Sequence, residues 1–303
     1  MESSLDSKHT APSAGQIISR GFLVAHCVLA GAILLTLLHA PAQLASALMI
    51  SLRDKTPSAP GTAPEQLLPA LLLSGVVILL AIGVFFLFPL IQGGVLGQVR
   101  DRLDSPDRPP RRFGLHSRLH YSRLLGNQLV FTLIMMAAIF PLVCVGAVVA
   151  VQSTAGAAEP PPGEVERQLL SHPVFLGGMV LVSVLSSAVG MIYWVANCVV
   201  VAEGRSMGAS WRSSFQFCRR NFPAVLAVWL VNLVAGAVLA PLGMLGQFGV
   251  VSSTWGLSAV ALIYSLLIGY WGVIVAGMSM SLYLGRRTHS ESQELAAPAA
   301  VGA

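Results

Sequence analysis

Residues 201–223 carry the side chains of this chain that are best able to do chemistry. Glu203 ends an apolar run and is followed by Gly204 and Arg205. Three more arginines follow, namely Arg212, Arg219 and Arg220. A carboxylate beside guanidinium groups can form an ion pair that ties helices together. We expect Glu203 to tether this segment, with Arg219 or Arg220 as its partner; exposure to water and a ligand-binding role are the alternatives.

A histidine pair, His116 and His120, is spaced so that both side chains would share one face of a helix. Such a pair can chelate a metal ion if further ligands lie nearby. Three aspartates precede it, but no third ligand stands at a fixed spacing, and the intervening prolines indicate a loose connection. We therefore expect no metal site, and we expect no cofactor elsewhere in the chain.

Other catalytic patterns are not found in the sequence. It has no paired acidic motif, no Gly-x-Ser-Gly motif with a partnering histidine, and no ordered phosphatase set. The four cysteines lack paired spacing, which argues against a disulfide framework or a zinc site. These observations predict a protein that is not an enzyme.

Long apolar runs must position these residues. The chain has 303 residues, of which 55% are hydrophobic and 10% charged, whereas soluble domains carry about 25% charged residues. Six runs reach the length of about 20 residues that crosses a bilayer; they are 22–40, 67–92, 128–152, 173–202, 223–247 and 256–284. The sequence thus predicts an all-α, polytopic membrane helix bundle over residues 21–285. Residues 1–20 and 286–303 are predicted to be disordered cytoplasmic tails.

The distribution of basic residues predicts the orientation of the bundle. Lys and Arg are concentrated in the segments that follow the second and fourth runs, while the segments after the first, third and fifth runs carry few. Because cytoplasmic loops hold the excess of basic residues, both termini are expected in the cytoplasm, with the bundle in a bacterial inner membrane. Residues 203–222 are then cytoplasmic.

Within that segment the spacing predicts an amphipathic helix over residues 205–222. One apolar stripe recurs at helical spacing and consists of Met207, Trp211, Phe215, Cys218 and Phe222. The arginines fall on the other faces. Such a helix can lie in the membrane interface, with its arginines on the phosphates of an anionic leaflet. We expect membrane lipids as partners and no nucleic acid; the sequence indicates no protein partner.

A weak internal similarity indicates a direct repeat of helical hairpins, with units at about 67–152 and 173–247. Gln92-Gly93 corresponds to Glu203-Gly204, and a second glycine follows four residues later in both copies. Further along, Arg118 matches Arg219, and Tyr121 matches Phe222. The repeat predicts two similar linkers, each with an amphipathic helix.

The pattern of a helix ending in Glu-Gly, an amphipathic stretch and an Arg-x-Asn-Phe entry resembles a broad family of uncharacterised bacterial polytopic membrane proteins. That family includes the membrane domain ahead of some glycerophosphodiester phosphodiesterases and the YciC-like inner-membrane proteins. The matching positions are Glu203, Gly204, Gly208, Trp211, Arg212, Ser213, Phe215, Arg219, Asn221 and Phe222. The resemblance covers roughly residues 67–250 and implies a shared architecture. This chain has no phosphodiesterase domain, so that activity is not implied.

These observations favour a non-enzymatic scaffold, or a protein of envelope or lipid homeostasis. A transporter or permease for a lipid-like or small neutral solute is the alternative, and a membrane-embedded enzyme is less favoured. Five polar residues within or beside the apolar runs are expected to form interhelical hydrogen bonds; they are Gln92, Asn127, Gln128, Asn197 and Asn232.

Overall fold

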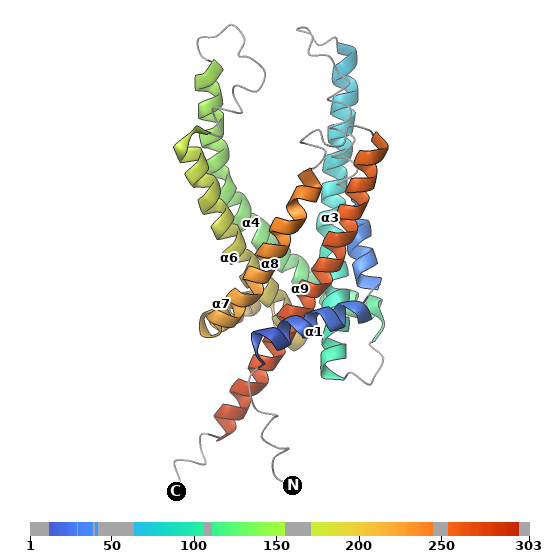
Figure 1. Ribbon diagram of the computed structural model, residues 1–303, viewed down its shortest axis with the longest axis vertical. Helices are drawn as coiled ribbons and strands as arrows, with labels where there is room; N and C mark the ends of the chain where they lie inside the picture. Colours follow the sequence, from blue (N-terminus) through green and yellow to red (C-terminus); the bar gives the residue numbers. More distant parts are fainter. Residues whose placement is uncertain are drawn as a thin grey trace.

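The computed structural model describes residues 12–28, 30–38, 40–41, 64–105, 111–154, 171–244 and 254–296, and in these residues the chain consists of helices joined by short turns. The main helices are α1 (Ala14–Cys27), α3 (Pro64–Asp104), α4 (Phe113–Thr154), α6 (Pro173–Glu203), α7 (Met207–Arg220), α8 (Phe222–Met244) and α9 (Thr254–Ala296) (Figure 1). Five of them are long and apolar enough to cross a membrane, namely α3, α4, α6, α8 and α9. The predictions of an all-α fold and of a multi-pass membrane protein are confirmed at this level.

The first predicted span, residues 22–40, is not one straight helix. Two helical pieces, Ala14–His26 and Ala30–Leu38, meet at an angle of 85°, so the chain has six candidate spans only if this bent pair counts as one. Contact with α9 accounts for the path of α1, because a Cβ atom on Gly21 would lie 2.4 Å from Cγ of Met278. A side chain at position 21 would therefore prevent the two helices from crossing here.

Both of the tails that were predicted to be disordered include residues that are helical in the structure. The first helix begins inside residues 1–20, where Ser13 and Gln16 form a capping box that satisfies free backbone N–H groups. At the other end α9 continues to Ala296, since Gln293, Glu294, Leu295 and Ala296 all favour helix. Residues 1–11, 42–63, 155–170 and 297–303, which include parts of both predicted tails and most of the predicted outer loops, lie outside the described residues.

The described residues of the linker predicted between the second and third spans are mostly helical. Helix α3 continues to Asp104 and α4 already begins at Phe113, because glycines let the two helices approach closely there. A Cβ atom on Gly97 would lie 2.2 Å from Cγ of His116, and one on Gly94 would meet the ring of Phe113. The two proposed repeat units therefore differ locally: Gln92 lies within a helix, whereas Glu203 ends one.

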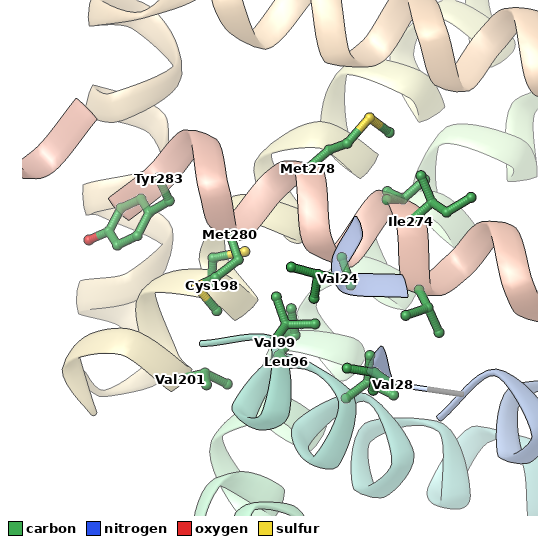
Figure 2. Close-up of a cluster of buried hydrophobic side chains, with 14 of the residues drawn as sticks. Val24, Val28, Leu96, Val99, Cys198, Val201, Ile274, Met278, Met280 and Tyr283 are labelled. Atoms are coloured by element: carbon green, nitrogen blue, oxygen red, sulfur yellow. The ribbon is translucent and has the colours of Figure 1, made fainter. Parts of the chain in front are cut away.

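The hydrophobic core lies toward one end of the molecule. It is built from α1, the lower half of α3, the last turns of α6 and the middle of α9, and Figure 2 shows Val24, Leu96, Cys198 and Met280 from these four elements. Away from this end the α4–α6 pair diverges from α3 and α9 (Figure 1). No residue is buried in the most apolar 18-residue window of α4 or of α6. The helices are thus held together mainly at the end where α1 and α7 lie.

Candidate functional site

The candidate site is the junction at the end of α6, which we call the α6 junction and define by Arg100, Arg123, Glu203, Gly204, Arg205, Tyr283 and Arg287. Helix α6 ends on Gly204, whose φ of 65° is left-handed and favours glycine. Arg100 donates to the carbonyl oxygen of Val201 at 2.9 Å, and Arg123 donates to that of Gly204. Two guanidinium groups from α3 and α4 thus satisfy the negative end of the α6 dipole.

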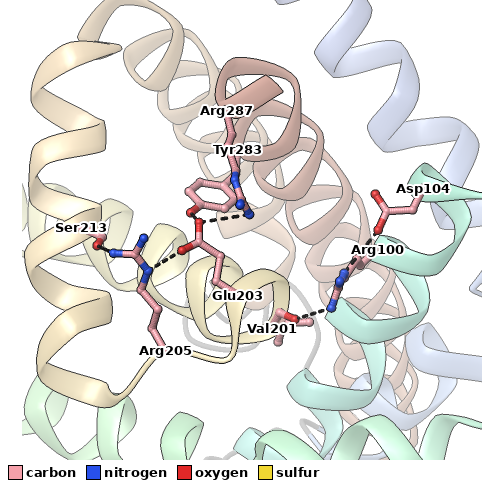
Figure 3. A network of polar contacts seen from close by, with 8 residues as sticks. All are labelled: Arg100, Asp104, Val201, Glu203, Arg205, Ser213, Tyr283 and Arg287. Carbon is pink, nitrogen blue, oxygen red and sulfur yellow. Dashed lines mark hydrogen bonds and ion pairs between the residues drawn. The ribbon is translucent and has the colours of Figure 1, made fainter. Parts of the chain in front are cut away.

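Glu203 is the centre of the α6 junction, and its side chain is 10% exposed. Its carboxylate accepts hydrogen bonds from the Tyr283 hydroxyl and from Nε of Arg205, and Nη1 of Arg287 lies 3.3 Å away (Figure 3). Arg205 also donates to Ser213 of α7 at 2.7 Å. One carboxylate therefore connects the end of α6 with both α7 and α9.

This geometry matches the tethering role that we expected for Glu203 but not the expected partners. The partners are Arg205 and Arg287, while Arg219 and Arg220 are exposed on α7. A largely buried carboxylate is stabilised only while its partners remain, because an unpaired buried charge costs several kcal/mol. The arrangement is suited to holding three helices in a fixed relation.

A buried amide network lies next to the α6 junction. Nδ2 of Asn127 donates to Oδ1 of Asn197 at 2.9 Å, and Nδ2 of Asn197 donates to Oε1 of Gln92 at 3.2 Å. The Tyr193 hydroxyl lies within hydrogen-bonding distance of the Gln92 and Gln128 oxygens, although its single proton can go to only one of them. The prediction of interhelical hydrogen bonds is confirmed for these amides.

The same network reaches α7. The hydroxyl of Ser210, which is buried, lies 3.3 Å from Oδ1 of Asn127 and donates to the carbonyl oxygen of Met207 at 2.7 Å. Helix α7 is thus fixed to the bundle by Ser210 at its first turn and by Ser213 one turn later. The buried residues of α7 are Ser210 and Ser214, and Phe217 and Cys218 pack against the core beside them.

The predicted apolar stripe of α7 is mostly turned away from the protein. Phe215 is 59% exposed and Phe222, at the start of α8, is 57% exposed, whereas Trp211 is half-buried. Arg212, like the arginines at 219 and 220, is exposed. An apolar groove of about 410 Å³ lies between α6, α7 and α8; it is lined by Phe215, Cys218, Arg219 and Phe222, among others.

The remaining predicted residues lie elsewhere. Arg118 is exposed and Tyr121 is half-buried, and both are within α4, so they do not belong to a second linker helix. His116 is buried and lies 2.9 Å from Asp101, whose carboxylate also accepts from the backbone N–H of Arg111. These contacts close the turn between α3 and α4. Among the described residues, no three His, Cys, Asp or Glu side chains could hold a metal ion.

Sequence reasoning missed several members of the site. Tyr283 and Arg287 were not chosen because they lie at least 80 positions from Glu203, and nothing in the local pattern links them. Tyr193 was missed because a tyrosine within an apolar run is usually read as part of the core. Gly93, Gly94 and Gly97 carried a usable signal, since small residues four apart mark close helix contacts in membranes.

The comparisons with known proteins add no assignment to this picture. No family model, no curated protein and no solved structure matches this chain.

Proposed function

We propose that this chain is a non-enzymatic membrane protein of lipid or envelope homeostasis that holds anionic lipids of the inner leaflet through α7. The observation that carries the proposal is the outer face of α7 and the start of α8, where exposed Phe215 and Phe222 lie near exposed Arg219 and Arg220 in the sequence. Aromatic rings can enter the acyl region while guanidinium groups bind phosphates. The apolar groove between α6, α7 and α8 can bind an acyl chain, and Arg219 at its wall can bind the phosphate of the same lipid.

The proposal places α7 at the cytoplasmic surface of a bacterial inner membrane. In this arrangement the bent first pair serves as the first of six spans, both termini are cytoplasmic, and the α3–α4 turn faces the cytoplasm. The charge pattern supports it, because arginines cluster on this end of the molecule. Cysteine introduced at Arg112, which is exposed, is expected to react with a membrane-impermeant maleimide only after the cells are opened. Labelling in intact cells would contradict this orientation.

Native mass spectrometry of the purified protein tests the lipid contact. Wild-type protein offered equal phosphatidylglycerol and phosphatidylcholine should retain the anionic lipid preferentially. Replacing Arg212, Arg219 and Arg220 together by Gln should remove most of that preference, since each basic residue near an anionic surface contributes about 1 kcal/mol. The matched triple Lys variant keeps the charge and should keep the preference. Unchanged retention in the Gln variant would refute the proposal.

A transporter of a lipid-like or small neutral solute is the second candidate. It is favoured by two adjoining cavities of about 290 and 210 Å³ between the helices, which share Trp194, Asn232 and Val275 in their walls. Transport requires such a path through the bundle, whereas anchoring by α7 does not. Flux of a fluorescent lipid across proteoliposomes, compared with protein-free vesicles, distinguishes the two: a scaffold gives no increase in rate.

A further inference from the structure

The side-chain amide of Gln92 is buried and only half of its hydrogen-bonding capacity is used. The residue is 2% exposed, and its oxygen accepts from Asn197 and lies 3.2 Å from the Tyr193 hydroxyl. Its nitrogen Nε2 has no hydrogen-bond partner among the described residues. A buried N–H group without a partner is unfavourable, and native structures rarely leave one unexplained.

Gln92 also lines the smaller of the two cavities, together with Asn232, Trp194 and Trp271. Because the amide oxygen of Gln92 is hydrogen-bonded to α6, its Nε2 group is the part of this side chain that remains available to a ligand in the cavity. Asn232 has a similar imbalance: its oxygen accepts from Nε1 of Trp271 at 2.8 Å, which leaves its NH₂ group able to donate. Two amide donors from α3 and α8 thus stand in the wall of one cavity.

The cavity walls indicate the charge of the ligand. Among the described residues that line the two cavities none is ionisable, and their polar members besides the amides are Ser186, Ser187, Ser279 and the indoles of Trp194, Trp229 and Trp271. An ionised group placed here would lose its hydration without gaining a counter-charge. The site therefore favours an uncharged ligand with acceptor oxygens.

The size and surroundings indicate a lipid. Neither cavity alone reaches the roughly 300 Å³ at the lower end of small-molecule sites, so each suits part of a molecule. Exposed apolar side chains continue the lining face of α6 outward at helical spacing, with Met179 41% exposed and Val180 65% exposed. A polar centre of ester oxygens can lie between Gln92 and Asn232 while acyl chains leave along this face of α6.

We propose that the cavities between α3, α6, α8 and α9 bind the ester region of an uncharged glycerolipid of the diacylglycerol type, with Gln92 and Asn232 donating to its oxygens. This site is separate from the α7 arginines, so it holds or fails independently of the proposed anchoring role. It also requires no transport, since a lipid can be held without being moved.

Equilibrium binding of tritiated dioleoylglycerol to the full-length protein in detergent micelles tests the site. Unlabelled dioleoylglycerol should displace the probe, while dioleoylphosphatidylcholine and oleate should not. Replacing Asn232 by Leu or Gln92 by Met should each weaken binding about tenfold, the factor for one hydrogen bond. The matched control is Gln216→Met, which changes an exposed amide on α7 outside both cavities and should bind as the wild type does.

The outcomes separate the explanations. Equal displacement by the phospholipid, or wild-type affinity in both cavity variants, overturns the proposal. If Gln92→Met unfolds because Tyr193 and Asn197 lose their acceptor, Asn232→Leu still decides, because residue 232 is exposed and outside that network. Loss of anionic lipid in the arginine variants with retained dioleoylglycerol binding would support both sites separately.

Discussion

At the residue scale, the α6 junction depends on one backbone conformation and one carboxylate. Gly204 takes the only positive φ among the described residues, and this turns the chain from α6 toward α7. Glu203, one position earlier, then faces Tyr283 and Arg287 of α9. Gly204, which forms the turn, and Glu203, which pairs with α9, are adjacent in the sequence. A substitution that changes the conformation of one therefore displaces the other.

Gly204→Ala should lower the free energy of unfolding by about 1–2 kcal/mol, the cost of placing a side chain in left-handed backbone. Its Cβ atom would also lie 3.2 Å from Nη1 of Arg123. Gly208→Ala is the matched control, because position 208 is in α7 and a Cβ atom there meets nothing within 4 Å. Thermal unfolding in detergent compares the two; equal melting temperatures would contradict the assigned role of Gly204.

Tyr283→Phe should destabilise the protein by about 1.5–3 kcal/mol, the range for a hydrogen bond to a charged group. The change removes the hydroxyl that donates to Glu203 and leaves the ring against Phe217. Tyr264→Phe, also in α9, is the control, since the Tyr264 hydroxyl forms no hydrogen bond with any of the described residues. If Tyr283→Phe has the same melting temperature as the control, the hydrogen bond from Tyr283 is not needed, and Arg205 and Arg287 alone stabilise the Glu203 carboxylate.

At the scale of elements, pairs of helices are joined by different means. Helices α3 and α4 touch through glycines, α4 is joined to α6 by buried amides and to α7 by Ser210, and α1 crosses α9 where Gly21 meets Gly277. Close backbone contact needs small residues, whereas hydrogen-bonded contact needs a partner on the other helix. Substitutions should therefore have effects that depend on which kind of contact they touch.

Gly97→Ala should destabilise the α3–α4 pair by about 1–3 kcal/mol, the usual cost of overpacking. The added methyl would lie 2.2 Å from Cγ of His116, so that side chain has to move away from Asp101. Gly83→Ala in the same helix has nothing within 4 Å of its Cβ atom and should be neutral. Thermal unfolding or resistance to proteolysis at residues 104–113 measures the difference.

The thiol of Cys218 should report how closely α7 lies against its neighbours. Burial raises the pKa of Cys218 from 9.0 to about 11, so at neutral pH its reactive thiolate is about 100-fold less abundant. In a variant with no other cysteine, its alkylation rate should rise tenfold per pH unit up to about pH 11. The alkylation rate of a cysteine placed at exposed Gln216 should instead level off near the ordinary pKa of a cysteine thiol. A plateau near pH 9 for Cys218 would mean that α7 is not packed this way.

The sequence correctly predicted the positions of helices that are apolar along most of their length. It misplaced the ends of helices that continue from an apolar segment into a polar one. The runs 173–202 and 256–284 were located well because apolar residues continue along them. Residues 93–104 and 113–127 were assigned to the linker because this part of the chain is basic and polar, yet they extend α3 and α4. The bend at Val28 has no proline to mark it. Its cause is the crossing with α9, and a contact between distant segments leaves no local pattern.

The candidate site was predictable in part for a related reason. Glu203 and Gly204 were singled out because a carboxylate and a glycine end an apolar run, and the structure gives both a structural role. The partners of Glu203 could not be chosen, since Arg287 lies 84 positions away and Arg219 is equally plausible by charge. Hydrogen-bonded amides were foreseen as a class, but their pairing depends on helix rotation.

At the scale of the whole molecule, the concentration of buried residues at one end changes how the protein would occupy a bilayer. Helices that converge near α1 and α7 and diverge beyond them (Figure 1) displace different areas in the two leaflets. Such a wedge relieves packing stress in a curved membrane and increases it in a flat one. The stability of this packing should therefore depend on the curvature and composition of the bilayer that surrounds the diverging helices.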